Sequence, residues 1–270
     1  MKKFSSLLII ITLSMFFLAG CKKDSDESPI NIFSVDDDIE FGKSMEAEIA
    51  SKPGEFPILS QSTYAGAYQH INRIRDSILN TGLIYYDERF EWKVYIIKND
   101  TILNAFATPG GYLYFYTGLI KFLDNEAQFA GVMGHEMAHA DLRHSTNQIT
   151  KVYGVQILLS ILLGQSQSQL TEIIASLAYG LGTLAFSRDH EYQADEYSVK
   201  YLYKTSYDAR GIADFFIKME GSPHPPEFLS THPSPENRIE KINEVWQGLG
   251  GKEGNTYEDS YNAFKASLPQ

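Results

Sequence analysis

The chain has only one cysteine, Cys21, among its 270 residues. An internal disulfide is therefore excluded, and the fold must be held together by its apolar core or by a metal. Basic residues are also scarce, with 23 Lys and Arg against 34 Asp and Glu and a formal net charge of −11. We therefore expect no nucleic-acid partner and no attachment to anionic lipid through a basic surface.

Apolar runs long enough to span a membrane are missing too. Phe4 to Leu18 follow the pair Lys2 and Lys3, but the run is too short for a span and predicts a secretory signal peptide over residues 1–20. Its end, LAGC, resembles the lipobox of bacterial lipoproteins, which implies cleavage before Cys21 and lipidation of that cysteine. Cleavage removes two lysines and changes the net charge from −11 to −13. We expect membrane attachment through acyl chains on Cys21.

The remaining sequence predicts one mainly helical domain of class α+β over residues 39–250. Residues 21–38 are polar and acid-rich and predict a flexible tether. Apolar residues recur at helical spacing in residues 39–50 and 64–79, and β-rich stretches follow at residues 92–97, 104–107 and 112–115. Because Pro109, Gly110 and Gly111 join the last two stretches, we expect a small antiparallel sheet. Residues 251–270 are polar and turn-rich and predict a C-terminal tail with a weak helix.

Two further apolar stretches lie at residues 152–163 and 170–186, divided by the polar run QSQSQ. The first is too short to cross a membrane, and the second carries Glu172, Ser176 and two glycines. We predict buried or hairpin helices here, with a membrane-facing or lid role as the alternative.

The stretch HEMAHADLRH, residues 135–144, carries the first half of a metal site. A capping pattern at residues 125–128 predicts a helix that begins there and runs through this stretch. On such a helix His135 and His139 face the same way, so that both imidazoles can reach one ion. Glu136 is placed to exchange a proton with a water molecule beside the metal. We expect one Zn²⁺ per chain, because zinc accepts His nitrogen and carboxylate oxygen and leaves a position for water.

The third ligand is expected from the later stretch SRDHEYQADEYS, residues 187–198. Glu191 and Asp195 share one face of a helix there, so Glu191 can complete a His₂Glu site and Asp195 can accept the N–H of a ligand histidine. His144 is the competing ligand. On a continuous helix it points about 140° away from the zinc face, so we do not assign it to the metal. His190 faces elsewhere on its helix and is expected at the surface or behind the ligands.

The sequence resembles the gluzincin metallopeptidase family of the Ste-type CAAX prenyl protease and HtpX, and within it the periplasmic BepA/LoiP-like lipoprotein branch. The resemblance covers residues 39–249 and rests on four stretches in the family's order, NAFATPGG (104–111), HEMAHADLRHS (135–145), SRDHEYQADEYS (187–198) and STHPSPENRI (230–239). It implies a zincin-like metalloprotease domain. It also implies zinc ligation by His135, His139 and Glu191, catalysis by Glu136 and ligand orientation by Asp195.

The resemblance adds expectations for substrate binding. Residues 104–107 would form the exposed edge of the sheet, where an extended substrate could add as a strand, with Asn104, Ala105 and Phe106 near it. His232 is implied as a stabiliser of the oxyanion, or as a loop histidine that caps the zinc at rest, a role that His224 could also fill. Arg238 is expected to order the same loop through a carboxylate, beside the substrate; an ordinary surface arginine is the alternative.

These observations predict a zinc metalloendopeptidase that cleaves exposed or misfolded cell-envelope proteins. We expect it to be anchored by the lipid on Cys21 to the outer membrane, on the periplasmic face, with unfolded or extended proteins as substrates. The alternative from another class is an envelope chaperone or assembly factor with little or no proteolysis.

Overall fold

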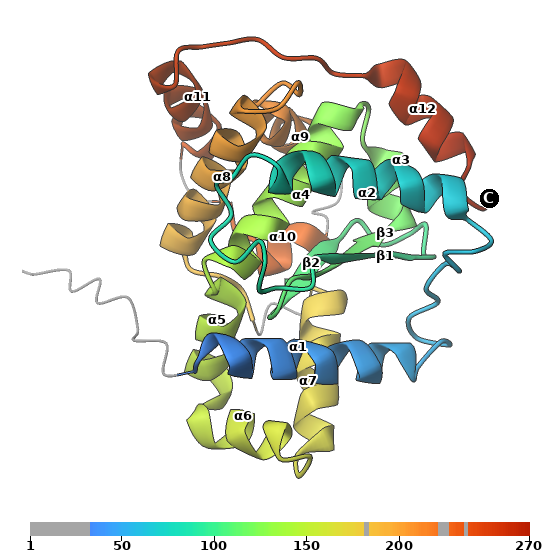
Figure 1. Cartoon of the computed structure of the whole chain (residues 1–270), viewed down its shortest axis with the longest axis vertical. Helices are drawn as coiled ribbons and strands as arrows, with labels where there is room; N and C mark the ends of the chain where they lie inside the picture. The colour runs from blue at the N-terminus through green and yellow to red at the C-terminus, as the bar shows by residue number, and fades with distance from the viewer. Residues whose placement is uncertain (1–32, 181–183, 221–226, 235–236) are drawn as a thin grey trace, which may run out of the picture. The chain divides into compact units, whose positions relative to one another are not determined.

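A small three-stranded sheet lies between two groups of helices (Figure 1). The computed structural model describes residues 33–180, 184–220, 227–234 and 237–270; the predicted signal peptide, Cys21 and His224 lie outside them. The strands are β1 (Lys93–Ile97), β2 (Ala105–Thr108) and β3 (Tyr112–Tyr116). The described helices are α1 (Val35–Ala50), α2 (Ala65–Leu79), α3 (Thr117–Phe122), α4 (Glu126–Asp141), α5 (His144–Tyr153), α6 (Val155–Leu162), α7 (Gln167–Ala178), α8 (Arg188–Tyr203), α9 (Gly211–Glu220), α10 (Glu227–Thr231), α11 (Arg238–Gly248) and α12 (Glu258–Ala266).

The sheet is mixed, which corrects the expectation of an antiparallel one. Strands β2 and β3 do form the predicted antiparallel hairpin, and its turn uses Gly110 and Gly111 at φ 77° and 83°. Strand β1, however, pairs with β3 in parallel, in the order β1-β3-β2. Two hydrogen bonds hold the segment after β1 beside the end of β3. Asn99 N donates to Thr117 Oγ1 at 3.0 Å, and Thr117 Oγ1 donates to Asp100. Because the two strand ends meet there, β1 must run in the direction of β3.

The two faces of the sheet belong to two different cores. Strand β3 is buried along its whole length, and its side chains alternate between the faces. Leu113 and Phe115 lie in the core with α2, α4, α8, α9 and α12. Tyr112, Tyr114 and Tyr116 lie in the core with α1, α6 and α7. Helices therefore cover both faces, and helix α4, which carries His135 and His139, lies on the first of them.

Helix α4 is buried at every position and packs between α8 and α9. Glycines allow this close approach. A Cβ added at Gly131 would lie 2.4 Å from Ile212 N on α9, and one at Gly134 would lie 2.9 Å from Ser198 Oγ on α8. Ser198 Oγ also donates to the Gly131 carbonyl at 2.8 Å. These contacts fix the position of α8 against α4.

The described helices α6 and α7 take up most of residues 152–163 and the first part of residues 170–186 and form a hairpin, as predicted; residues 181–183 lie outside the described residues. Helix α5 leads into α6, and α6 and α7 pack against each other and against α1 (Figure 1). Across the residues that the structure describes, none of the helices combines the length and apolar character that crossing a bilayer requires.

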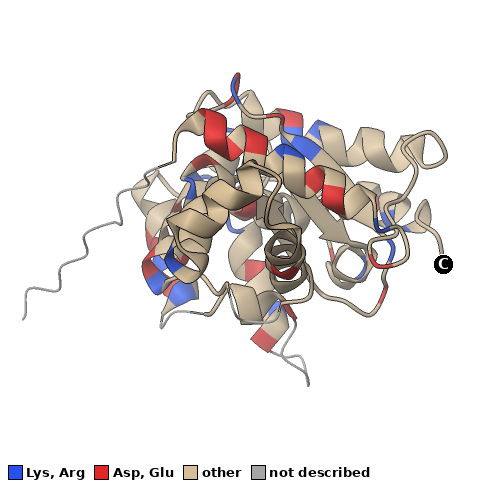
Figure 2. Ribbon diagram, turned by 90° about the horizontal axis from the view of Figure 1, so that it is seen from below, with Lys and Arg blue, Asp and Glu red and all other residues tan. Residues whose placement is uncertain are grey.

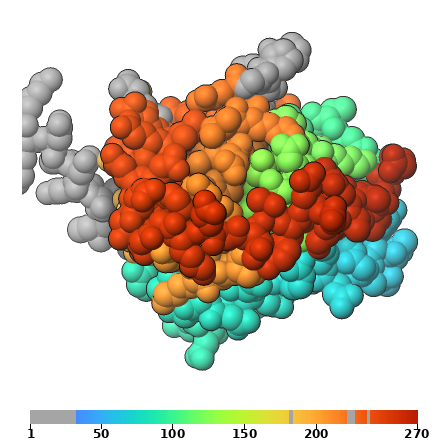
Figure 3. Space-filling model, turned by 90° about the horizontal axis from the view of Figure 1, so that it is seen from above, coloured from blue at the N-terminus to red at the C-terminus, as the bar shows by residue number. Residues whose placement is uncertain are grey.

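The C-terminal residues are part of the folded unit rather than a separate tail, since residues 31–270 cluster together. Tyr261 and Phe264 on α12 are buried, and Tyr261 Oη donates to the Ile120 carbonyl at 2.8 Å. Figure 3 shows the C-terminal segment, in red, lying across one face of the molecule. Although this stretch is mostly polar, its few aromatic side chains are enough to pack it against the rest of the domain.

Candidate metal centre

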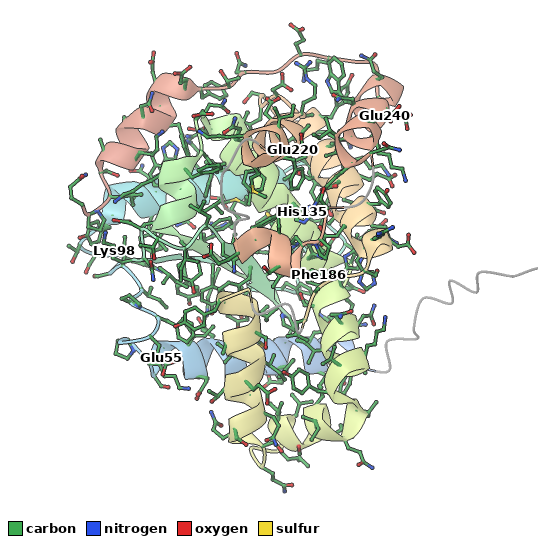
Figure 4. The ribbon with its side chains drawn as sticks, turned by 180° about the vertical axis from the view of Figure 1, so that it is seen from behind. Glu55, Lys98, His135, Phe186, Glu220 and Glu240 are labelled. Atoms are coloured by element: carbon green, nitrogen blue, oxygen red, sulfur yellow. The ribbon has the colours of Figure 1, made fainter. Side chains whose placement is uncertain are left out.

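Helix α4 begins as predicted and carries the first two ligands. The Asn125 side chain accepts from Gln128 N at 3.0 Å, which caps the helix. One helical turn apart, His135 and His139 turn their Nε2 atoms toward the same point, and these atoms lie 3.0 Å apart. Both side chains are fully buried. The His135 label in Figure 4 marks the interior position of this site.

Glu191 on α8 joins the two histidines, as predicted. Its Oε1 lies 3.4 Å from His139 Nε2, and its Oε2 lies 3.6 Å from His135 Nε2. The N-cap Ser187, whose hydroxyl accepts from His190 N, starts α8 one turn earlier. Burial alone would raise the pKa of Glu191, but the charges of His232 and Arg238 hold it well below its usual range. The carboxylate is therefore ionised, which is the form that binds a metal.

His232 is the fourth member of the cluster. Its Nδ1 lies 3.1 Å from Glu191 Oε1 and 3.2 Å from His135 Nε2. One ligand atom from each of His135, His139, Glu191 and His232 lies within 4.8 Å of every other, and all four residues are buried. His232 thus lies where a capping histidine would lie.

Glu136 lies beside the cluster but outside the ligand set. Its Oε1 is 3.4 Å from His232 Nε2, and the nearby Ala107 backbone N–H lowers the pKa of its carboxylate. Burial raises the pKa of Glu136, and the charges of His232 and His135 oppose that rise. A carboxylate with a raised pKa is suited to taking up and giving back a proton. The contact with Ala107 was not foreseen from the sequence, since it depends on how β2 lies against α4.

Asp195 and Arg238 form a buried pair behind His135. Asp195 Oδ1 lies 2.9 Å from His135 Nδ1, although the N–H does not point straight at the oxygen. Arg238 donates to both Asp195 oxygens at 2.6 and 2.8 Å, and its Nη2 lies 2.9 Å from Glu191 Oε2. The expected carboxylate partner of Arg238 is therefore Asp195. Arg238 is only 2% exposed, so it is neither a surface residue nor a substrate contact in this state.

The β2 strand is at the edge of the sheet, as expected, but it is not exposed. All four of its residues are buried, and Asn104, just before it, is buried too. Asn104 Nδ2 donates to the carbonyls of Leu177 and Ala178 at 3.0 and 3.1 Å, so it holds the end of α7. Phe106 stacks on Tyr114 with ring centroids 4.7 Å apart. The expected substrate contacts are therefore covered in this state.

His144 is outside the ligand set, as predicted, but it does not face away from the site. The helix breaks at Arg143, which has φ 60°, and the chain turns His144 back against His139. The Nδ1 atoms of the two rings lie 3.2 Å apart. His190 stacks on His144 with centroids 4.2 Å apart and planes 13° apart. Position 143 is an arginine rather than a Gly or Asn, so the sequence does not indicate a left-handed residue there.

The donor set fits zinc. It offers imidazole nitrogens and a carboxylate oxygen, converging from α4, α8 and the segment after α10. Among the described residues this is the one group of three or more such side chains that could hold a metal ion. Phe186 stacks on His139 at 3.9 Å between centroids and closes one side of the site (Figure 4).

The fold and the site define a zinc metallopeptidase: a buried HExxH helix is completed by a glutamate from a second helix. The chain belongs to peptidase family M48, whose profile matches residues 70–245, well over half of its length. The cofactor is zinc, and the family is one of peptidases.

Curated relatives agree with this assignment. The Beta-barrel assembly-enhancing protease of Escherichia coli (strain K12) is 33% identical over 160 residues, which cover 54% of this chain and 32% of the relative. The mitochondrial metalloendopeptidase OMA1 of Arabidopsis thaliana is 33% identical over 153 residues, covering 56% of this chain and 31% of the relative. For human OMA1 the identity is 28% over 179 residues, covering 58% and 33%. The chain thus matches about a third of the length of these relatives.

Proposed function

We propose that this protein is a lipid-anchored endopeptidase of the outer membrane, facing the periplasm, that cleaves exposed or misfolded envelope proteins. The observation that carries the chemistry is the buried His135–His139–Glu191 cluster with Glu136 beside it. The proposed location is supported by the LAGC stretch ending at Cys21. The name of the Escherichia coli relative, which refers to β-barrel assembly, also supports an envelope role.

The proposed division of labour follows from where each side chain lies. Zinc held by His135, His139 and Glu191 would supply a Lewis acid that makes water nucleophilic near neutral pH. Glu136 takes the proton of the attacking water and returns it to the leaving amine. The Ala107 N–H lies near this carboxylate, and the low dielectric of the buried site strengthens its interactions with the charges around it.

Substrate access requires two changes from the observed arrangement. His232 must leave the ligand cluster, because its Nδ1 lies where a fourth ligand would lie. The end of α7 must also move from Asn104 before an extended peptide can pair with β2. We take this arrangement as a resting form, in which His232 lies among the ligand side chains and α7 covers the substrate strand.

The test compares Glu136→Gln with the wild-type protein. The variant keeps all ligands, so it should retain zinc while losing cleavage of unfolded substrates by at least about a hundredfold. Glu196→Gln on the exposed side of α8 is a matched charge control and should cleave normally. Normal cleavage by purified Glu136→Gln protein would rule out the mechanism.

The closed site also favours the second candidate function, a chaperone or assembly factor that rarely cleaves. Comparing the envelope proteomes of wild-type and Glu136→Gln cells separates the two. If the protein is an endopeptidase, its uncleaved substrates should accumulate in the Glu136→Gln cells. A chaperone leaves the proteome unchanged, and its protection of unfolded proteins persists in the variant.

A further inference from the structure

The imidazole of His144 lies directly behind the zinc ligand His139. Its Nδ1 is 3.2 Å from His139 Nδ1, on the opposite side of that ring from the metal cluster. The side chain is 2% exposed, so water cannot take its place as a hydrogen-bond partner. On its far side, His144 Nε2 lies 3.4 Å from Gln193 Oε1.

The positions of the protons on His139 and His144 follow from metal binding by His139. A neutral imidazole has one N–H, so a ring that binds zinc through Nε2 must carry its proton on Nδ1. His139 is therefore the donor, and His144 Nδ1 must accept. The proton of His144 then lies on Nε2, where the amide oxygen of Gln193 can accept it. The two contacts are thus consistent with a chain of hydrogen bonds in which His139 donates to His144 and His144 donates to Gln193.

We propose that His144 is a positioning residue for zinc: its Nδ1 accepts the His139 proton and fixes the tautomer and orientation of that ligand. Each of the two ligand histidines thus has a partner at its Nδ1 atom: His144 for His139, and Asp195 for His135. One ligand thus faces a carboxylate and the other a neutral ring. Partners of this kind, behind a metal ligand, typically change metal affinity by 10–100-fold when removed.

Two substitutions at the same position separate hydrogen bonding from packing. His144→Asn keeps an acceptor oxygen close to the place of Nδ1, whereas His144→Leu keeps apolar volume and removes the acceptor. We expect His144→Leu to bind zinc about 10–100-fold more weakly in competition with a chromogenic chelator. His144→Asn should stay within about threefold of wild type. His190→Leu removes the ring that stacks on His144 but no acceptor, and should also stay within about threefold.

A spectroscopic readout reports the role independently of activity. In the zinc-loaded protein the His139 Nδ1–H should give a slowly exchanging downfield proton resonance that persists in His144→Asn and disappears in His144→Leu. Circular dichroism and urea unfolding of each variant show whether the fold is kept. Wild-type zinc affinity in His144→Leu would overturn the proposal. Equal losses in the Asn and Leu variants, with the fold intact, would also overturn it, because packing would then be the cause.

A second observation concerns the outer face of α6. Leu159 and Leu163 lie one helical turn apart and are 47% and 71% exposed, and nearby Val152 is 42% exposed. No charged residue occurs from Val152 to Thr171, although 21% of the chain is charged. Figure 2 views the molecule from the α6 end, and α6 is drawn entirely in tan because it contains neither acid nor base. The exposed residues on this face are Val152, Gln156, Leu159 and Leu163, which are uncharged and, apart from Gln156, apolar. Such a face suits a non-aqueous neighbour.

The start of the described chain lies close to this face. Arg143, just before α5, donates to the carbonyls of Phe33 and Ser34 at 2.6 and 3.0 Å. Helix α5 is ten residues long, about 15 Å, and leads directly to α6. The twelve residues from Cys21 to Phe33 can extend no further than about 40 Å. A lipid on Cys21 would therefore keep α6 within reach of the same bilayer.

We infer that α6 inserts Leu159 and Leu163 among the acyl chains of the membrane that holds the anchor. This inference rests on the proposed lipid at Cys21. The absence of lysine and arginine from residues 152–171 means that insertion needs no anionic lipid and is insensitive to salt.

The test uses the full lipidated protein in phosphatidylcholine vesicles with brominated acyl chains, which quench nearby tryptophan. Fluorescence is compared with wild type to subtract Trp92 and Trp246. Leu163→Trp should lose at least half of its added fluorescence, while Ile217→Trp, at the 53% exposed control position on α9, should keep its own. Mass spectrometry of the N-terminal peptide tests the anchor separately. Lipid on Cys21 without quenching at position 163 would overturn the insertion, as would cross-linking through position 163 to a second copy instead.

Discussion

Replacing Asp195 by asparagine should weaken both the fold and the zinc site. The carboxylate lies 2.9 Å from His135 Nδ1 and accepts two hydrogen bonds from Arg238, at 2.6 and 2.8 Å. Asparagine has a similar shape but is neutral, and its amide group can offer only one acceptor oxygen. The buried Arg238 charge would then keep a single carboxylate neighbour, Glu191 Oε2 at 2.9 Å.

The expected magnitudes follow from this geometry. Removing one partner of a buried ion pair typically costs about 3–5 kcal/mol. Because Glu191 still faces Arg238, we expect the lower end, about 3 kcal/mol in the metal-free protein. Zinc affinity should also fall, by about 10–100-fold, since His135 loses the group that orients it.

Two measurements check this prediction. Urea unfolding in the presence of a chelator gives the free energy of unfolding of the metal-free protein, and chelator competition gives zinc affinity. Glu196→Gln is the matched control, because Glu196 is the next residue, its side chain is 43% exposed, and it forms an ion pair with Lys200. It should change the free energy of unfolding by less than about 0.5 kcal/mol. A loss below about 1 kcal/mol in Asp195→Asn, with zinc affinity within about twofold, would refute the reasoning.

Three further predictions concern other parts of the chain. Burial raises the pKa of Glu126, but the contact with His70 at 2.9 Å and the hydrogen bonds from Tyr207 and Arg73 lower it from 4.5 to about 2. Its contribution to stability is therefore present above about pH 4.5 and is lost as the pH falls toward 2. The difference in unfolding free energy between wild type and Glu126→Gln should therefore shrink from about 3 kcal/mol at pH 6 to near zero at pH 2; a difference independent of pH would contradict this. Gly131→Ala should destabilise the fold by at least about 2 kcal/mol in urea unfolding, because its Cβ would lie 2.4 Å from Ile212 N; an unchanged midpoint would show that α9 can shift. His232→Ala should bind zinc more weakly and cleave a short unstructured peptide faster, since it uncaps the metal, whereas a fall in rate of about a hundredfold or more would assign His232 to the oxyanion instead.

Comparison of sequence and structure shows where local rules sufficed. The helix of His135 and His139 was predictable because the spacing of four residues and the Asn125 cap are local properties. Glu191 and Asp195 were predictable for the same reason, as two carboxylates on one turn of α8. The hairpin of β2 and β3 followed from its glycine turn. The direction of β1 did not, because it depends on contacts between Asn99, Asp100 and Thr117.

The site shows the same division at the level of single side chains. The sequence by itself determined which residues can bind zinc, because helical periodicity places them on common faces and their chemistry selects the metal. Only the tertiary structure decided that His232 joins the ligands, that Arg238 pairs with Asp195, and that α7 covers β2. It also decided the place of His144, which a continuous helix would turn away but the break at Arg143 brings against His139. The physical reason is that ligand spacing within a helix is set by local backbone geometry. The partners behind the ligands are set by where the chain bends and which segments pack together.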